Sequence, residues 1–280
     1  ACVLVARQDL PEPRRCRRPR AAATSAREAA ASPAPAEDAL RDVLLVGVSG
    51  PSGSGKTTLA RQLAVALDSP LYPIGMDWFL NPKWMPKDEN FGEKNWETPA
   101  GVDFERLSGE LDSAAASLRS ARRVPDELRV GGRFGEDVVR DEKRGQRLDS
   151  RRVAVIVEGF LLFYNHSLAR AFDAQLWLEA DCELCLQRRQ DRGRRRAKNL
   201  DASSRWFREQ VWVHYEKNRS TQLKNAARVC ILDATAAREA LLAEALAHCR
   251  PLLAAGAGLS QAPRRRRRGP SAASPSPSRK

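Results

Sequence analysis

The segment GPSGSGKT at residues 50–57 constrains the fold of this chain more than any other feature. It fits the pattern G-x-x-x-x-G-K-[ST], a loop whose successive backbone N–H groups converge on a phosphate. Its glycines permit backbone turns that a Cβ would obstruct. The apolar run VLLVGV precedes the loop, and TTLARQLAVAL follows it with leucines four residues apart. The sequence therefore predicts a strand, a phosphate-binding loop and a helix in direct succession.

The loop is expected to bind ATP together with Mg²⁺. Lys56 would reach the β- and γ-phosphates, and the Thr57 hydroxyl would hold the metal ion. Free N–H groups at the start of the following helix favour negative charge. The loop residues expected to bind the nucleotide are Gly50, Ser52, Gly53, Ser54, Gly55, Lys56, Thr57 and Thr58.

Strands and helices alternate along the rest of the chain, which indicates a parallel sheet. We predict an α/β fold of the P-loop NTPase type, with a five-stranded parallel sheet, helices on both faces and an Arg-rich lid at about 192–204. The charged segment 121–151 is expected to contain a hairpin, and 83–99 a long loop. Strands are expected at 43–48, 71–75, 152–159, 174–180 and 229–234, and helices at 56–68, 103–119, 167–172, 181–192, 205–226 and up to about 255.

Composition sets the limits of the folded part. Residues 1–38 and 261–280 are poor in apolar residues with helical or strand periodicity, so we expect a disordered or targeting segment and a disordered basic tail around a domain at 39–260. Of the 48 Lys and Arg and 35 Asp and Glu, the first segment carries 7 and 5 and the tail 7 and 0. The domain is therefore only mildly basic, which favours an enzyme over a nucleic-acid-binding fold.

Localisation is expected to be cytoplasmic, with two alternatives. The Arg- and Ser-containing start resembles an organellar transit peptide in composition, and Arg264–Arg268 could act as a nuclear signal or contact RNA. No apolar run approaches the ~20 residues that span a bilayer. The six cysteines form no disulfide framework, and Cys182 and Cys185 have no second pair nearby, so packed, reduced thiols are expected.

Two carboxylates follow predicted strands and should meet the loop in space. Asp77 follows the strand at 71–75, and Glu158 ends the strand at 152–159. Ligands of parallel sheets gather beyond the carboxyl ends of the strands. The chain lacks the N-K-x-D and D-x-x-G motifs of GTPases and the H-R-D and D-F-G motifs of protein kinases, and its LSGE at 107–110 falls inside a predicted helix. Among the classes of P-loop and kinase enzymes considered, these observations leave a kinase that phosphorylates a small molecule.

Five motifs, in order and with their spacing, resemble those of the nicotinamide riboside kinases within the wider uridine kinase superfamily. They are GVSGPSGSGKTTLARQL, MDWFLNP, NWETP, VEGFLLF and CLQRRQDR, and the resemblance covers about residues 43–234. It implies phosphorylation of a ribonucleoside 5′-hydroxyl, nicotinamide riboside first, with uridine or cytidine as the alternative. A P-loop scaffold that binds nucleic acid through the basic tail is the alternative from another class.

The resemblance also implies roles for individual residues. The catalytic set is Asp77, Lys56, Glu158 and Arg192, with Thr57 and Asp77 at the metal. Arg188 and Arg192 would clamp the nucleotide phosphates. The substrate set is Asp77, Trp78, Trp96, Glu97 and Arg189, where Glu97 would bind the ribose hydroxyls and Trp96 would stack on the base. The family's second stacking aromatic falls at Arg194, so Trp206 or Tyr215 would have to substitute, and Asp233 either faces the adenine or caps a helix.

Overall fold

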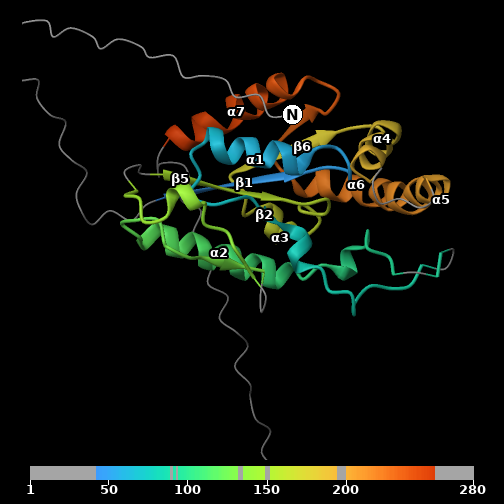
Figure 1. Cartoon of the computed structure of the whole chain (residues 1–280), viewed down its shortest axis with the longest axis horizontal. Coiled ribbons are helices and arrows are strands. Elements are labelled where there is room, and N and C mark those ends of the chain that lie inside the picture. Colours follow the sequence, from blue (N-terminus) through green and yellow to red (C-terminus); the bar gives the residue numbers. More distant parts are fainter. Residues whose placement is uncertain are drawn as a thin grey trace, which may run out of the picture. The chain divides into compact units, whose positions relative to one another are not determined.

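The centre of the computed structural model is a five-stranded sheet in the order β2-β5-β1-β6-β7, with every neighbouring pair parallel (Figure 1). This confirms the predicted sheet. The strands are β1 (Asp42–Ser49), β2 (Ile74–Gly75), β5 (Arg152–Glu158), β6 (Ala174–Glu179) and β7 (Val229–Asp233). The structure describes residues 42–88, 91–92, 94–131, 135–148, 152–193 and 200–255, all within the compact unit Leu40–Lys280.

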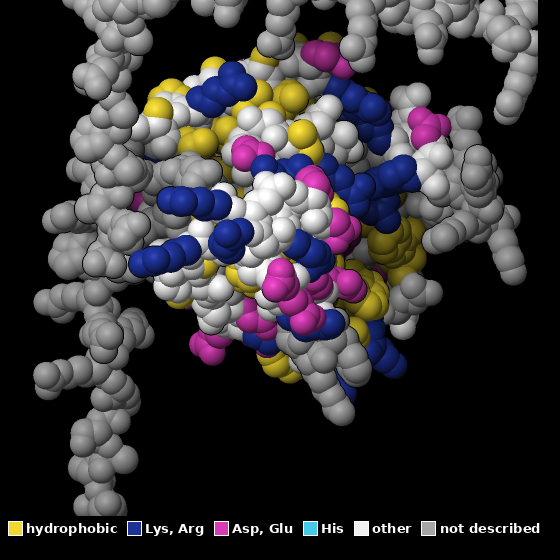
Figure 2. Space-filling view, turned by 60° about the vertical axis from the view of Figure 1, so that its left-hand side comes forward, with side chains coloured by type: hydrophobic (Ala, Val, Ile, Leu, Met, Phe, Trp, Pro, Cys, Tyr) yellow, Lys and Arg dark blue, Asp and Glu magenta, His cyan; other side chains and the backbone are white. Residues whose placement is uncertain are grey.

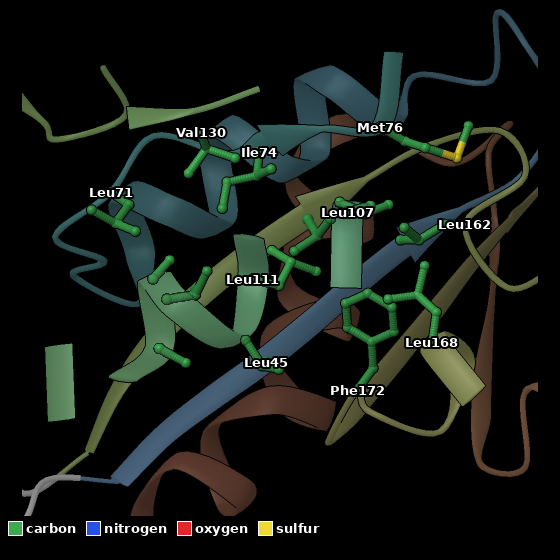
Figure 3. Close-up of a cluster of buried hydrophobic side chains, with 14 of the residues drawn as sticks. Leu45, Leu71, Ile74, Met76, Leu107, Leu111, Val130, Leu162, Leu168 and Phe172 are labelled. Atoms are coloured by element: carbon green, nitrogen blue, oxygen red, sulfur yellow. The ribbon is translucent and has the colours of Figure 1, made fainter. Parts of the chain in front are cut away.

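Side chains of β1 alternate between two hydrophobic cores, one on each face of the sheet, because successive side chains of a strand point to opposite faces. Leu44 and Val46 pack into the core shared with α1 (Lys56–Ala66) and α7 (Arg238–Ala254). Val43 and Leu45 pack into the core of α2 (Phe104–Ser120), to which Leu107 and Leu111 contribute (Figure 3). Helices therefore cover both faces, as predicted.

Further helices and short 3-10 turns lie between and after the strands. They are α3 (His166–Ala169), α4 (Cys182–Gly193), α5 (Leu200–Trp206), the π-helix η5 (Phe207–Trp212) and α6 (Val213–Asn225), and short 3-10 turns are η1 (Met76–Phe79), η2 (Pro99–Gly101) and η4 (Asp141–Lys143). Asp103 caps α2, because its side chain accepts a hydrogen bond from the Arg106 N–H at 3.0 Å. No described helix is long and apolar enough to cross a membrane.

Two predicted boundaries were wrong. The strand at 71–75 is reduced to Ile74–Gly75, because Leu71 bridges to Val139 and the Tyr72 N–H donates to the Val138 carbonyl instead. The helix placed at 205–226 already begins at Leu200 and contains the π-helix η5. Of the predicted lid, residues 194–199 lie outside the described part of the chain.

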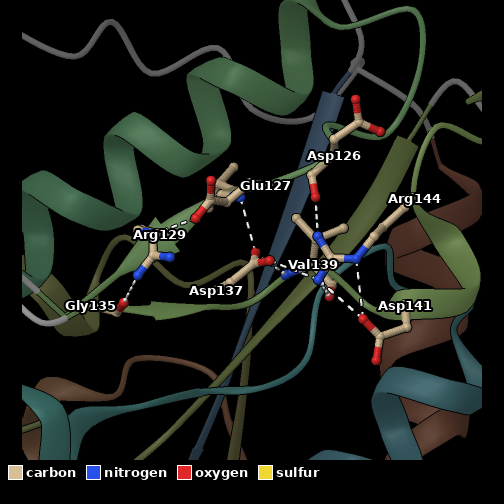
Figure 4. A network of polar contacts seen from close by, with 9 residues as sticks. Asp126, Glu127, Arg129, Gly135, Asp137, Val139, Asp141 and Arg144 are labelled. Atoms are coloured by element: carbon tan, nitrogen blue, oxygen red, sulfur yellow. Dashed lines mark hydrogen bonds and ion pairs between the residues drawn. The ribbon is translucent and has the colours of Figure 1, made fainter.

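The segment 121–148 contains the predicted hairpin, formed by β3 (Arg129–Val130) and β4 (Glu136–Asp137). Asp137 accepts hydrogen bonds from the N–H groups of Leu128 and Val139 and pairs with Arg144 at 2.7 Å (Figure 4). On the face seen in Figure 2, acidic and basic side chains are mixed. The described cysteines Cys182, Cys185, Cys230 and Cys249 are free, as predicted for the C-x-x-C pair.

Candidate active site

The phosphate-binding loop has the backbone that its glycines predict. Gly50, Gly53 and Gly55 all adopt positive φ, of 139°, 97° and 108°. At Gly53 a Cβ would lie 2.6 Å from the Cys185 carbonyl oxygen, so the loop also needs glycine to pass close to α4. Gly55 is the N-cap of α1, and the helix begins at Lys56. The loop therefore presents its N–H groups at a helix start, where anions bind.

Two arginines of α4 hold the loop from outside. Arg188 donates one hydrogen bond to the Ser54 carbonyl and one to the Ala234 carbonyl, both at 2.8 Å. Arg189 donates to the Ser52 hydroxyl at 2.6 Å. Arg188, which was predicted to clamp phosphates, and Arg189, which was predicted to bind the substrate, thus both brace the loop.

A cavity of about 380 Å³ opens at the loop and collects most of the predicted nucleotide-binding residues. Asp77 and Glu158 line it, as the parallel strand ends predict. Gly75 and Val48 both pair with Glu158, which brings the ends of β2, β5 and β1 together. The lining residues include Ser52, Gly53, Ser54, Gly55, Lys56, Thr57, Thr58, Asp77, Glu158, Arg188 and Arg192, and on the far side Ala234, Ala236 and Arg238.

Burial and neighbouring charges shift the pKa values of the ionisable groups in this cavity. Lys56 is buried and donates to the Pro51 carbonyl at 2.8 Å. Burial lowers the pKa of Lys56, while Glu158 and Asp77 act to raise it. Asp77 is reachable by solvent, yet the enclosing protein removes enough water to raise the pKa of its carboxyl, against the opposing effect of Lys56. Burial likewise raises the pKa of Glu158.

Thr57 and Glu158 form the second polar pair of the cavity. The Thr57 hydroxyl donates to Glu158 Oε1 at 2.9 Å. Together with Asp77 they offer hydroxyl and carboxylate oxygens, the hard donors that Mg²⁺ prefers, and Mg²⁺ commonly takes one or two carboxylates and completes its shell with phosphates and water. The donor set therefore fits the predicted ion. Among the described residues no group of three or more His, Cys, Asp or Glu side chains is arranged to hold a metal.

Glu97 stands beside this cavity rather than in its lining. Its side chain is buried, and burial raises its pKa to about 7, against Arg189 and Lys56, which act to lower it. Asp77 also acts on the Glu97 charge. Glu97 therefore lies within electrostatic range of Lys56 and Asp77, two of the predicted catalytic groups.

A protein-family model described as an AAA domain matches residues 46–212, which is more than half of the chain. The chain belongs to the AAA domain family. The matched range contains the phosphate-binding loop, Asp77, Glu97, Glu158 and helix α4.

Relatives of this AAA domain include small-molecule kinases. It is 30% identical over 157 residues to the nicotinamide riboside kinase of Eremothecium gossypii, covering 55% of this chain and 65% of that protein. It is 26% identical over 165 residues to a uridine kinase of Schizosaccharomyces pombe, covering 54% and 32%. A sugar kinase structure from Janibacter sp. overlaps 75% of this chain and 98% of its own with 17% identity and a TM-score of 0.44. The matched regions thus cover about two thirds or less of these two curated relatives.

The aromatic residues that were predicted to contact the substrate differ in how exposed they are. Trp96 is 41% exposed, next to Glu97. Trp78 packs against the α2 core, and its carbonyl accepts a hydrogen bond from Arg106 at 2.9 Å. Tyr215 cannot substitute for the second stacking aromatic, because it is buried against Trp177 with an inter-ring angle of 22°.

Trp206, the other candidate aromatic, lies beside Arg189, whose guanidinium carbon is 5.6 Å from its ring centroid. Arg194 lies outside the described residues. Asp233 accepts hydrogen bonds from the N–H and hydroxyl of Thr235, so it closes the turn after β7. It is not among the residues that line the cavity.

Sequence reasoning missed the polar residues of α6 that support the site. Gln222 accepts from the Ser49 hydroxyl at 3.0 Å and donates to the Phe160 carbonyl at 3.0 Å, so it ties the end of β1 to the residues after Glu158. Asn218 donates to the Glu97 carbonyl at 3.4 Å. Their spacing of four, continued by His214, was a visible signal, since residues four apart share one helix face.

Proposed function

We propose that this AAA domain protein is a kinase that transfers the γ-phosphoryl group of ATP to the 5′-hydroxyl of a ribonucleoside, with nicotinamide riboside as its preferred acceptor. The observation that carries the proposal is the meeting of Lys56, Thr57, Asp77 and Glu158 in one cavity at the phosphate-binding loop. The 30% identity to a nicotinamide riboside kinase supports the choice of acceptor.

In this proposal Asp77 orients the acceptor hydroxyl and takes its proton as the phosphoryl group leaves ADP. The transition state of phosphoryl transfer is loose, so positioning matters more than basicity. The raised pKa of Asp77 makes it a better proton acceptor than an ordinary aspartate. Lys56 would offset charge on the β- and γ-phosphates.

Thr57 and Asp77, with Glu158 next to them, would hold Mg²⁺, which when bound neutralises phosphate charge. Glu158 keeps the Thr57 hydroxyl in place, because the two already share a hydrogen bond. Arg188 and Arg192 would contact the phosphates from α4.

On the acceptor side, Glu97 would bind the ribose 2′- and 3′-hydroxyls, because a carboxylate accepts two hydrogen bonds. Trp96 is exposed beside it and would stack on the base; a cationic pyridinium suits such a ring. Arg189 would balance the Glu97 charge, and Trp78 would support the turn that carries Asp77.

A panel of nucleosides tests this proposal. ADP release is measured with nicotinamide riboside, uridine, cytidine and adenosine at equal concentration, with Asp77→Asn as the inactive control. We expect the highest kcat/KM for nicotinamide riboside. Turnover of uridine alone would replace the acceptor and keep the reaction, and turnover of none of them would refute the kinase. Deletion of residues 261–280 should leave turnover unchanged, whereas the scaffold alternative requires that tail.

A further inference from the structure

One face of helix α6 touches two segments of the candidate site. His214, Asn218 and Gln222 are spaced four residues apart; the first two contact the segment 95–97, and Gln222 contacts Phe160. Asn218 and Gln222 hold the Glu97 carbonyl and the Phe160 carbonyl. His214 lies 2.7 Å from Asn95, measured between its Nε2 and the amide Nδ2. Of the three residues, only His214 can change its charge near neutral pH.

The Asn95 side chain is a junction between His214 and Glu97. Asn95 is buried, and its Oδ1 accepts a hydrogen bond from the Glu97 N–H at 3.0 Å. With the oxygen used in this way, the Nδ2 group faces His214. An amide NH₂ group can only donate, so the imidazole Nε2 must accept and must be unprotonated.

Protonation of His214 would break this arrangement whichever way Asn95 turns. In the present orientation, two donors would face each other across 2.7 Å. If the amide turned over, its oxygen could accept from the imidazolium, but its NH₂ group would then face the Glu97 N–H, again donor to donor. A charged His214 therefore costs the Glu97 segment one hydrogen bond in either case.

We propose that neutral His214 is a positioning residue of the acceptor site: through Asn95 it fixes the backbone of Glu97, the residue that binds the nucleoside. This rests on the proposed function, in which Glu97 holds the ribose. His214 touches no reacting atom, so it acts on the affinity for the nucleoside and not on the transfer step.

The surroundings of His214 favour the neutral form. Burial lowers its pKa from the usual 6.5; Lys217 on the same helix also acts to lower it, and Asp88 on the facing loop acts to raise it. A basic group with a lowered pKa stays neutral at physiological pH and gains its proton only in acid. The contact is therefore present above pH 6.5 and is lost as the pH falls through the lowered pKa of His214.

The π-helix η5 directly precedes this face. Its residues Phe207, Gln210 and Val211 are buried, and the guanidinium carbon of Arg189 lies 5.4 Å from the Phe207 ring centroid. A π-turn inserts an extra residue and changes which side chains of the following helix share a face, and such turns are frequent at functional sites. The π-helix that leads into α6 therefore also packs against Arg189, which acts to lower the pKa of Glu97.

Two substitutions of His214 test the proposal in the full-length protein. KM and kcat for nicotinamide riboside are measured at pH 8 with saturating ATP. His214→Leu should raise KM about fivefold to tenfold with kcat unchanged, because one buried hydrogen bond is lost. His214→Gln should keep KM within about twofold, because its side-chain oxygen can accept from Asn95 as Nε2 does. His248→Leu is the matched control: burial also lowers the pKa of His248, but it lies on α7, away from Glu97.

A pH series separates His214 from Glu97, which itself titrates. Between pH 8 and pH 5.5 the wild-type KM should rise through both groups, and that of His214→Gln through Glu97 alone. The ratio of the two KM values should therefore grow severalfold toward acid. A constant ratio would overturn the inference, as would a His214→Leu variant with unchanged KM, or one that loses only thermal stability and kcat. Absence of nucleoside turnover by the wild type refutes the proposed function itself, and this inference with it.

Discussion

Replacement of Glu97 by glutamine should stabilise the fold while it weakens the site. The buried Glu97 carboxyl has its pKa raised from 4.5 to about 7. In the folded state it therefore holds a proton that the unfolded chain has already released between these two values. Stability falls by about 1.4 kcal/mol for each pH unit in that window, which amounts to about 3 kcal/mol over the whole rise. Glutamine has no proton to lose, so it escapes this cost.

The measurement is urea denaturation of both proteins, followed by tryptophan fluorescence at pH 5 and pH 8. The stability gap between Glu97→Gln and wild type should widen by about 2.5 kcal/mol from pH 5 to pH 8, in favour of the variant. At pH 8 the variant should lose about tenfold or more in kcat/KM for the nucleoside, because an amide accepts from fewer hydroxyls than a charged carboxylate. An equal stability difference at both pH values would show that the pKa of Glu97 is not raised in the folded state, and would refute the prediction.

Three further substitutions probe other parts of the site. Asp77→Asn should lower turnover by about 100-fold or more while the affinity for a non-hydrolysable ATP analogue, measured by calorimetry, stays largely unchanged, because the proton acceptor is lost but the phosphate-binding loop, Thr57 and Glu158 stay in place. Gly53→Ala should lower ATP affinity and the melting temperature, since its φ is 97° and its Cβ would meet the backbone of α4. The control Gly109→Ala, with open space at its Cβ in the interior of α2, should leave ATP affinity unchanged and raise the melting temperature. Arg106→Ala should raise the KM for the nucleoside by freeing the Trp78 carbonyl, and an unchanged KM would contradict that link.

Local sequence patterns predicted the parts of the fold whose cause is local. The strand, glycine loop and helix at 42–66 are contiguous, and parallel strand ends bring Asp77 and Glu158 together by geometry alone. The strand at 71–75 was overestimated because Leu71 and its neighbour pair with the segment near Val139. Nothing in the sequence LYPIG shows whether it pairs with the central sheet or with the segment near Val139. The π-helix was not predicted, because one additional residue in a helical turn does not change the spacing of apolar residues enough to be recognised.

Contacts between distant segments explain the rest of what the sequence could not predict. Asn95 and His214 are 119 positions apart, so only the tertiary fold brings them together. The start of α5 at Leu200, where the expected helix began at 205, also involves a partner elsewhere, since Gln190 of α4 donates to the Ser204 hydroxyl at 2.8 Å. Such boundaries depend on tertiary contacts and not on propensity.

The candidate site places three carboxylates near a loop that would bind phosphates, so it needs positively charged groups. Lys56 acts on three carboxylates, Asp77, Glu97 and Glu158, all of which have their pKa raised by burial. Arg188 already bonds two carbonyls, yet a guanidinium has five N–H donors, so bracing the loop leaves donors for a phosphate. A lysine has three donors on one atom and could not span both carbonyls and a phosphate in a fixed plane. Bracing and phosphate binding are therefore compatible at Arg188, and the choice of arginine follows from the need for both.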